Sequence, residues 1–242
     1  PASFHAENPR IQAPLNPQLQ LARLLQLASP ALPVGAYTYS QGLEWAVETG
    51  VVRDAASAGV WIADLLRHGI GRYEAPLVSA LMKVWTAADT AEIGRLNGEF
   101  LASRESAELR AETAQMGFSL HRLVRDLRDP GLSPIESTLA SLEEVAFPTG
   151  WAGLAAHWKI SPPDALTAYL WSWAENQVMA ALKAVPLGQA SGQRLLAELG
   201  GLIPSVAVDA LKLPETGGAN FTPAFAIACA RHETQYSRLF RS

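Results

Sequence analysis

A chain of 242 residues, 49% apolar and 17% charged, can bury a sizeable core as one large globular domain or two small ones. Nineteen basic and 23 acidic residues give a formal net charge of −4 without a basic run, which argues against nucleic acid as a partner. A single cysteine, Cys229, excludes an internal disulfide and suits a reducing cytosol. Because the amino end lacks the basic-then-apolar pattern of a signal peptide, we expect a cytoplasmic protein.

The first residues predict a tail followed by a helix. Residues 1–17 contain four prolines and few large apolar side chains, so we expect a disordered tail there and a helical domain over residues 18–242. Apolar residues then recur at steps of three and four, which places them on one helix face: Leu21, Leu24, Leu25 and Ala28.

A stiff corner is predicted after this helix. Pro30 and Pro33 fix φ and remove backbone donors, and Gly35 can adopt conformations closed to other residues. Ser40 is expected to cap the next helix, which carries Glu44 near its positive end and stops at Gly50.

Cap residues and apolar spacing predict helices in the middle of the chain. They are expected after Asp54 as far as Gly69 and Gly71, over residues 76–87, twice within the charge-rich stretch 89–128, and after the Ser-Pro pairs at 133 and 161. The last of these covers about residues 164–185. Polar residues at its middle, Glu175, Asn176 and Gln177, argue against a membrane span and favour a central core helix.

The remaining stretch is also predicted to be helical. Pro186 and Gly188 break the central helix, and two shorter helices are expected as far as Leu213. A link over residues 214–220 then leads to a final helix capped by Thr222 and Pro223. Since no alternating run long enough for a sheet occurs, we predict an all-α, single-domain bundle of about ten helices.

The sequence contains no complete catalytic or metal-binding motif. His232 and Glu233 begin like a zinc protease helix, but Tyr236 stands where the second histidine is needed, and no phosphate-binding glycine motif occurs. Cys229 and His232 lie one helical turn apart and could hold nickel or zinc, although both also fit an apolar stripe; we predict no metal and no cofactor. Two alternatives stay open: an all-helical enzyme with a polar pocket around Glu175, and a direct nickel carrier.

Three blocks of sequence resemble the UreF family of urease accessory proteins. They are Pro33-Val-Gly-Ala-Tyr-Thr-Tyr-Ser-Gln-Gly-Leu-Glu44, Lys183-Ala-Val-Pro-Leu-Gly-Gln189 and Ala230-Arg-His-Glu-Thr-Gln-Tyr-Ser-Arg-Leu-Phe-Arg-Ser242. The resemblance implies a scaffold, not an enzyme, that dimerises, docks onto UreD (UreH in some organisms) and recruits the GTPase UreG. GTP hydrolysis would then be coupled to nickel insertion into the urease apoprotein.

Matching motif positions imply roles for individual residues. The surface for UreG would contain Tyr37, Ser40, Glu44, Lys183 and Gln189, supported structurally by Pro33, Gly35, Gly42, Pro186 and Gly188. Glu44 and Lys183 would offer opposite charges at this surface. Replacing either with alanine is therefore expected to weaken recruitment of UreG without unfolding the chain.

The end of the chain is assigned to UreD. We expect one amphipathic helix of about 18 residues after Thr222, with an apolar stripe and a basic ridge, ordered mainly by docking; packing on its own domain is the alternative. The stripe is Phe225, Cys229, His232, Tyr236, Leu239 and Phe240, and the ridge is Arg231, Gln235, Arg238 and Arg241. The residues expected to contact UreD are Arg231, His232, Glu233, Tyr236, Arg238, Phe240 and Arg241. Low charge and seven tryptophans further predict an apolar patch and a homodimer.

Overall fold

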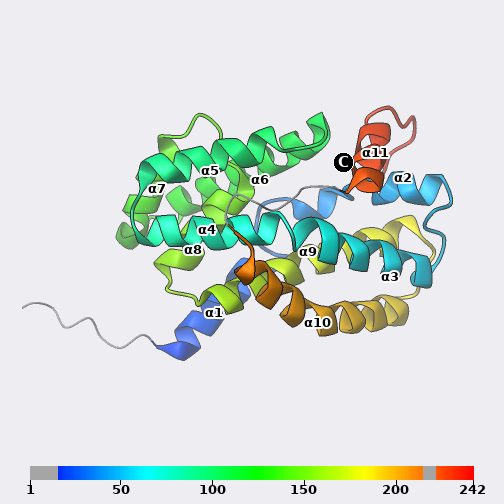
Figure 1. Ribbon diagram of the computed structural model, residues 1–242, viewed down its shortest axis with the longest axis horizontal. Coiled ribbons are helices and arrows are strands. Elements are labelled where there is room, and N and C mark those ends of the chain that lie inside the picture. The colour runs from blue at the N-terminus through cyan, green and yellow to red at the C-terminus, as the bar shows by residue number, and fades with distance from the viewer. Residues whose placement is uncertain (1–15, 215–221) are drawn as a thin grey trace, which may run out of the picture.

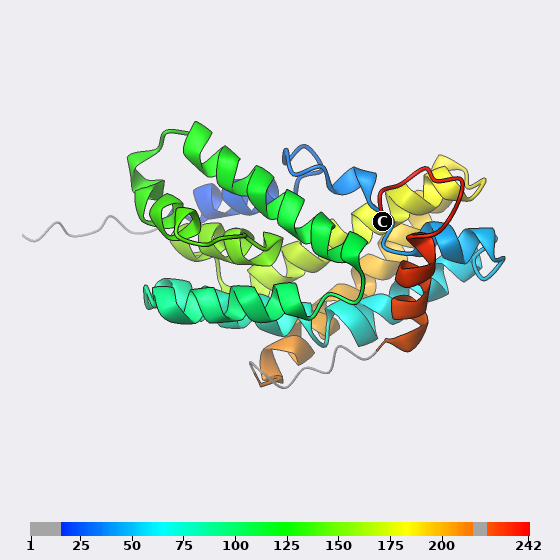
Figure 2. The ribbon, with the colours of Figure 1, turned by 90° about the horizontal axis from the view of Figure 1, so that it is seen from above.

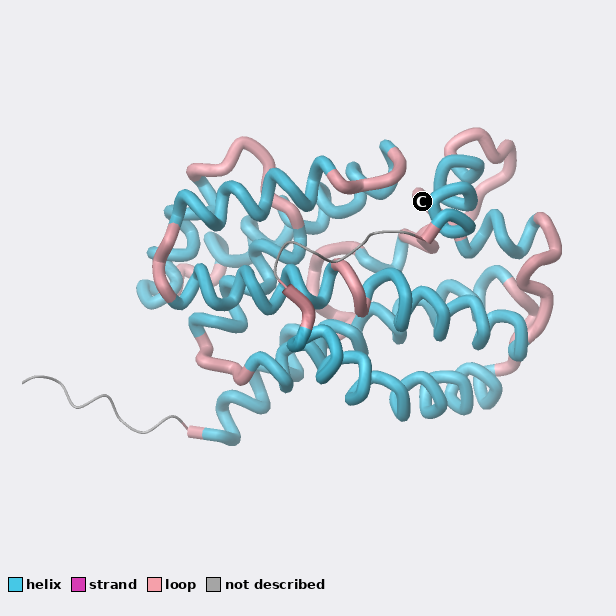
Figure 3. The backbone as a smooth tube through the Cα atoms, viewed as in Figure 1, coloured by secondary structure: helices cyan, strands magenta, loops and turns pink. Residues whose placement is uncertain are grey.

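The computed structural model describes residues 16–214 and 222–242, and in these ranges the chain is helical without strands (Figures 1 and 3). The predicted all-α fold is confirmed. The helices are α1 (Pro17–Ala28), α2 (Leu43–Glu48), α3 (Ala55–Asp64), α4 (Glu74–Thr86), α5 (Thr90–Ala102), α6 (Ala107–Asp126), α7 (Ser133–Ala140), α8 (Phe147–His157), α9 (Pro162–Ala184), α10 (Gln189–Lys212) and α11 (Pro223–His232). A π-helical stretch, Leu65–Ile70, continues α3, and short 3₁₀ turns occupy Ala36–Thr38 and Pro130–Leu132.

Several helix starts follow from their cap residues. Asp54 and Ser57 form a capping box at α3, and the Ser161 hydroxyl accepts the backbone N–H of Asp164 in α9. The predicted cap at Ser133 is wrong, because the 3₁₀ turn ahead of it runs directly into α7 and Leu132 takes the cap position. Asn16 and Pro17 begin α1, which corrects the end of the predicted tail; the rest of that tail and the link over 215–220 lie outside the described residues.

The core lies where α4, α8 and α9 pack together, with α1 and α10 against α9 (Figure 1). Residues 75–82 of α4 and 148–155 of α8 are all buried. Because α8 is apolar on every side, no helical period marks it in the sequence, and it was not predicted. Gly117 lets α6 approach the backbone at Val145, where an added Cβ would lie 1.9 Å from the carbonyl oxygen.

Two predicted helices differ from the structure. The two short helices expected after Gly188 form one helix, α10, because a continuous buried face against α9 outweighs the local effects of Gly200, Gly201 and Pro204. The final helix, α11, has 10 residues and ends at His232. We call residues 233–242 the end segment; Figure 2 shows it folding back from α11 toward the corner between α1 and α2.

None of the helices within residues 16–214 and 222–242 combines the length and apolarity needed to cross a bilayer.

Candidate functional site

The corner between α1 and α2 has the backbone that its glycines predict. Gly35 and Gly42 have φ of 78° and 75°, in the left-handed region that favours glycine. At Gly42 a side chain would also meet α11, since a Cβ would lie 3.0 Å from that of Ala228 and 3.1 Å from Cys229 Sγ. Gln41, between Ser40 and Gly42, also has positive φ, at 52°.

The end segment is hydrogen-bonded to this corner. The carbonyl oxygen of Ser242 accepts the backbone N–H groups of Ser40 (2.8 Å) and Gln41 (3.1 Å) and the Ser40 hydroxyl (2.6 Å). Arg241 donates its N–H to the carbonyl of Thr38 at 2.9 Å. Ser40 is fully buried, and Gly42 takes the N-cap position of α2, although the Ser40 hydroxyl accepts the N–H of Glu44 in the first turn at 3.3 Å. Ser40 therefore fixes the end segment instead of facing a partner directly.

Glu44 lies below the surface and also holds the end segment. Its side-chain carboxylate accepts the backbone N–H groups of Leu239 (2.6 Å) and Phe240 (3.0 Å). Only 6% of Glu44 is exposed, which corrects the expectation of a surface carboxylate. The family motif therefore contains a structural anchor at a position that sequence alone assigned to a partner.

His232 connects this anchor to α6. Its Nε2 lies 3.1 Å from Glu44 Oε2 and its Nδ1 lies 2.6 Å from Glu108 Oε2, while Arg238 donates to the other oxygen of Glu108 at 2.6 Å. Each ring nitrogen therefore lies within hydrogen-bonding distance of a carboxylate oxygen. Both ring nitrogens of the candidate metal ligand are thus already used.

Cys229, the other candidate ligand, is buried, and burial raises the pKa of its thiol well above the ordinary value. Metal binding needs the thiolate, which this environment disfavours. In the described part of the chain, no group of three or more His, Cys, Asp or Glu side chains is arranged to hold a metal ion.

Tyr37 and Lys183 lie together at the surface above the end segment. Lys183, in the last turn of α9, donates to the carbonyl of Tyr37 at 3.3 Å, and its Nζ is 5.6 Å from the ring centroids of both Tyr37 and Phe240. Tyr37 is 63% exposed. Gln189 is exposed at the start of α10, and no hydrogen bond among the described residues joins it to Tyr37 or Lys183.

The motif positions predicted to have a structural role differ in whether their backbone requires that residue type. Pro33, Pro186 and Gly188 are exposed, and Gly188 has an ordinary φ of −73° at the cap position of α10. Its glycine identity is therefore not required by backbone conformation, in contrast to Gly35 and Gly42.

The residues assigned to UreD do not share one helix face, because the end segment is not helical. His232 and Phe240 are buried, whereas the rest are exposed: Arg231, Glu233, Tyr236, Arg238 and Arg241. Glu233 accepts the backbone N–H of Ala107 (2.7 Å) at the start of α6. The predicted long amphipathic helix is wrong, and the alternative, packing of this segment on its own domain, is what the structure has.

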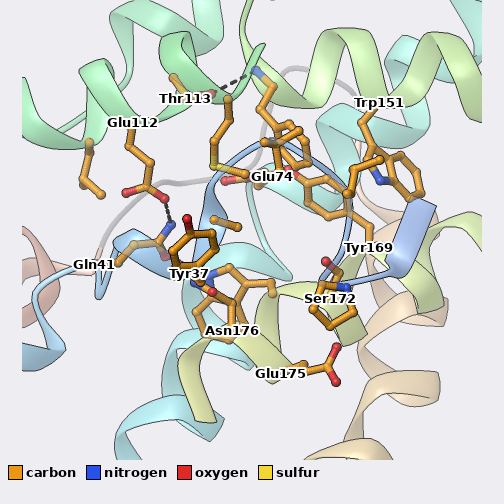
Figure 4. Close-up of a pocket in the computed structure, with 18 of the residues that line it drawn as sticks. Tyr37, Gln41, Glu74, Glu112, Thr113, Trp151, Tyr169, Ser172, Glu175 and Asn176 are labelled. Atoms are coloured by element: carbon orange, nitrogen blue, oxygen red, sulfur yellow. Dashed lines mark hydrogen bonds between the residues drawn. The ribbon is translucent and has the colours of Figure 1, made fainter. Parts of the chain in front are cut away.

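A cavity of about 150 Å³ lies beside the corner (Figure 4). Apolar and aromatic side chains form much of its wall, including Phe147, Trp151 and Trp173. The ionisable and polar groups that line it include Glu74, Arg104, Glu112, Tyr169, Glu175 and Asn176. Glu175 and Asn176 were predicted to share a pocket with Gln177, but Gln177 does not line this cavity and is fully buried, and its amide lacks a hydrogen-bond partner in the described residues.

The carboxyl groups in the cavity have perturbed acidities. Burial raises the pKa of Glu112 to about 7 and also raises that of Glu74, although the neighbouring Arg104 guanidinium opposes the shift at Glu74. Burial, with the adjacent Glu74 carboxylate, raises the pKa of Tyr169 well above its usual range. Sequence reasoning missed Glu74, Arg104 and Glu112 because they come from α4, the loop before α6 and α6, and no local pattern shows that these segments meet.

Comparisons with known proteins agree with these features. The sequence profile of the UreF family matches residues 52–200. Among curated proteins, the chain is 74% identical over 224 residues to "Urease accessory protein UreF" of Dechloromonas aromatica, covering 93% of this chain and 98% of that protein. Proteins of the same name from Azoarcus sp. and Methylobacillus flagellatus are 60% and 49% identical, covering 93% and 92% of this chain and 96% and 97% of their own lengths. The chain belongs to the UreF family of urease accessory proteins.

Proposed function

We propose that the chain is a urease accessory scaffold that bridges UreD/UreH and the GTPase UreG and couples GTP hydrolysis to nickel insertion into the urease apoprotein. Membership of the UreF family supports a role in urease maturation. One structural observation carries the finer proposal: the corner and the end segment, two blocks of the family motif, are hydrogen-bonded to each other beneath exposed side chains.

In this proposal the UreG surface is centred on Tyr37 and Lys183, which are exposed and in contact. Ser40 and Glu44 contribute by fixing the backbone beneath them, and Gln189 borders the surface at the start of α10. Tyrosine is among the residues enriched in protein interfaces, which supports Tyr37 as the centre of this surface.

UreD is proposed to bind the outer side of the end segment. Tyr236 and Leu239 expose their side chains there, next to the basic residues Arg238 and Arg241. Self-association as a homodimer is proposed through α1, where Leu19, Leu21 and Leu25 are more than half exposed. In this proposal the scaffold works in the cytoplasm.

The test is copurification of UreG with the chain in the presence and absence of GTP. We expect Tyr37→Ala and Lys183→Ala to lower the amount of UreG captured. Lys212→Ala, at an exposed lysine in the last turn of α10, is the matched charge control, and Tyr236→Ala should reduce capture of UreD instead. Unchanged capture of UreG by both corner variants would contradict the assignment. Tight binding of Ni²⁺ by the isolated chain in equilibrium dialysis would favour the carrier function.

A further inference from the structure

Glu112 of α6 forms a buried seat that joins the end segment to the corner. One of its carboxylate oxygens accepts the Ser242 hydroxyl at 2.7 Å, and the other accepts the Gln41 side-chain amide at 2.7 Å. Figure 4 shows the bond between the Gln41 and Glu112 side chains as a dashed line. The Gln41 amide oxygen in turn accepts the indole N–H of Trp173 in α9 at 2.8 Å. Three segments far apart in the chain therefore meet at this carboxylate.

These contacts also determine the backbone of the corner. Gln41 has a φ of 52°, a conformation that a residue with a side chain adopts at a cost of about 1–3 kcal/mol. The backbone N–H of Gln41 donates to the carbonyl oxygen of Ser242. Its side-chain amide donates to Glu112 and accepts from Trp173. These bonds hold Gln41 in its left-handed conformation.

The seat is short of positive charge. Only 5% of Glu112 is exposed, so its carboxylate is removed from water when Ser242 is in place. The charged and titratable groups that face it include Glu74 from α4, Arg104 before α6, Tyr39 in the corner, Tyr169 from α9 and Cys229 from α11. Arg104 is the single cation in this set, and it also pairs with Glu74 at 3.5 Å.

We propose that Glu112 and Gln41 are positioning residues that hold the corner and the end segment together, and that the seat closes with uptake of a proton by Glu112. This regulation concerns the same surface as the proposed function and rests on it for its biological meaning. A neutral carboxyl group keeps both contacts, since its carbonyl oxygen still accepts from Gln41 and its O–H can donate to the Ser242 hydroxyl, which serves either role.

The direction of the pH dependence follows from the pKa of Glu112 in the closed seat. Burial raises the pKa of Glu112 from 4.5 to about 7 in the closed state, whereas opening returns water to the carboxylate and lowers its pKa. A group with a raised pKa in the closed state favours closing below that value and ceases to do so as pH rises through about 7. With 4.5 and 7 as the two limits, the closing equilibrium should be about tenfold more favourable at pH 6 than at pH 8.

Amide hydrogen exchange of the full chain, without partners, tests this inference. Gln41 and Arg241 report on the seat because their N–H groups bond to Ser242 and Thr38. After correction for intrinsic exchange rates, we expect about tenfold higher protection of both amides at pH 6 than at pH 8. Glu112→Gln, an isostere of the protonated form, should show high protection at both pH values. The exposed Glu48→Gln, on α2, should behave as the unaltered chain.

A second variant keeps the test decisive if Glu112→Gln does not fold. Ser242→Ala removes a hydrogen bond that lowers the pKa of Glu112, so the pH at which protection falls should move upward. Protection independent of pH in the unaltered chain, or a pH dependence retained in Glu112→Gln, would overturn the proposal. Capture of UreG is measured separately: if exchange behaves as expected while Tyr37→Ala leaves capture unchanged, the proposed function fails and the proton-linked seat stands.

Discussion

Replacing Glu44 with alanine should release the end segment while the helical bundle stays folded. The substitution removes the acceptor of two backbone N–H groups and one of the two carboxylates beside His232. Hydrogen bonds to a charged group contribute about 1.5–3 kcal/mol each, and the Glu44 carboxylate accepts two of them from the end segment. Since these contributions overlap, we expect a loss of about 3–5 kcal/mol, confined to the contacts of residues 233–242.

Limited trypsin digestion measures this loss, because cleavage in a segment that opens rapidly tracks the population of its open form. Exposed Arg231 and Arg238 supply cleavage sites next to and within the end segment. A loss of about 3 kcal/mol should raise the cleavage rate by about 100-fold, or to the limit set by a detached segment. Helical circular dichroism and its cooperative melt should persist in the digested protein.

Two controls separate charge from packing. Glu48→Ala, one turn later on the same helix, removes an exposed carboxylate and should leave cleavage unchanged. Glu44→Gln keeps an acceptor oxygen but not the charge, so its cleavage rate should be intermediate. If Glu44→Ala is cleaved no faster than the unaltered chain, Glu44 does not anchor the segment and the reasoning fails. A loss of UreG capture in Glu44→Ala would report on the anchor, so Lys183→Ala is the cleaner surface probe.

Three further substitutions and one labelling reaction test the packing. Gly117→Ala should lower stability by about 3 kcal/mol in thermal melts, because its Cβ would lie 1.9 Å from the Val145 carbonyl oxygen. Gly98→Ala in α5 should raise stability by about 0.5–1 kcal/mol, because a Cβ at that position meets nothing within 4 Å. Equal melting temperatures for the two variants would contradict this packing. Lys183→Ala should change stability by no more than about 1 kcal/mol despite its ring contacts, since the side chain is exposed; a larger loss would mean that it mainly supports α9. Cys229 should resist a thiol reagent at pH 8 until the chain is denatured, because burial raises the pKa of its thiol; rapid labelling of the folded chain would contradict its burial.

Local signals were sufficient where one residue determines the backbone. Asp54 and Ser161 cap helices as predicted because each side chain bonds to an N–H within three residues, an interaction contained in a few letters of sequence. Gly35 and Gly50 adopt positive φ for the same local reason. The helical character of most segments could therefore be predicted without tertiary information.

Tertiary packing determines the elements that were predicted wrongly or not predicted. A helix buried on all sides, such as α8, has no polar face to mark its period, and α10 continues through Pro204 because its buried face is uninterrupted. Helical spacing continued past His232, but hydrogen bonds to Glu44, Thr38 and Ser40 offered residues 239–242 a different conformation. None of these partners is close in sequence, so no local pattern could report them.

The candidate site shows the same division between local and distant information. Motif residues in the corner and at the end of α9 fall into an exposed pair, Tyr37 and Lys183, and a buried pair, Ser40 and Glu44, that binds the end segment. If UreD binds the outer side of that segment and UreG binds the corner, the two sites share the hydrogen bonds between Ser40 and Ser242. Any preference of one partner for the closed arrangement must then appear, with equal coupling free energy, in the binding of the other. A scaffold built in this way can make recruitment of UreG depend on UreD without direct contact between the two partners.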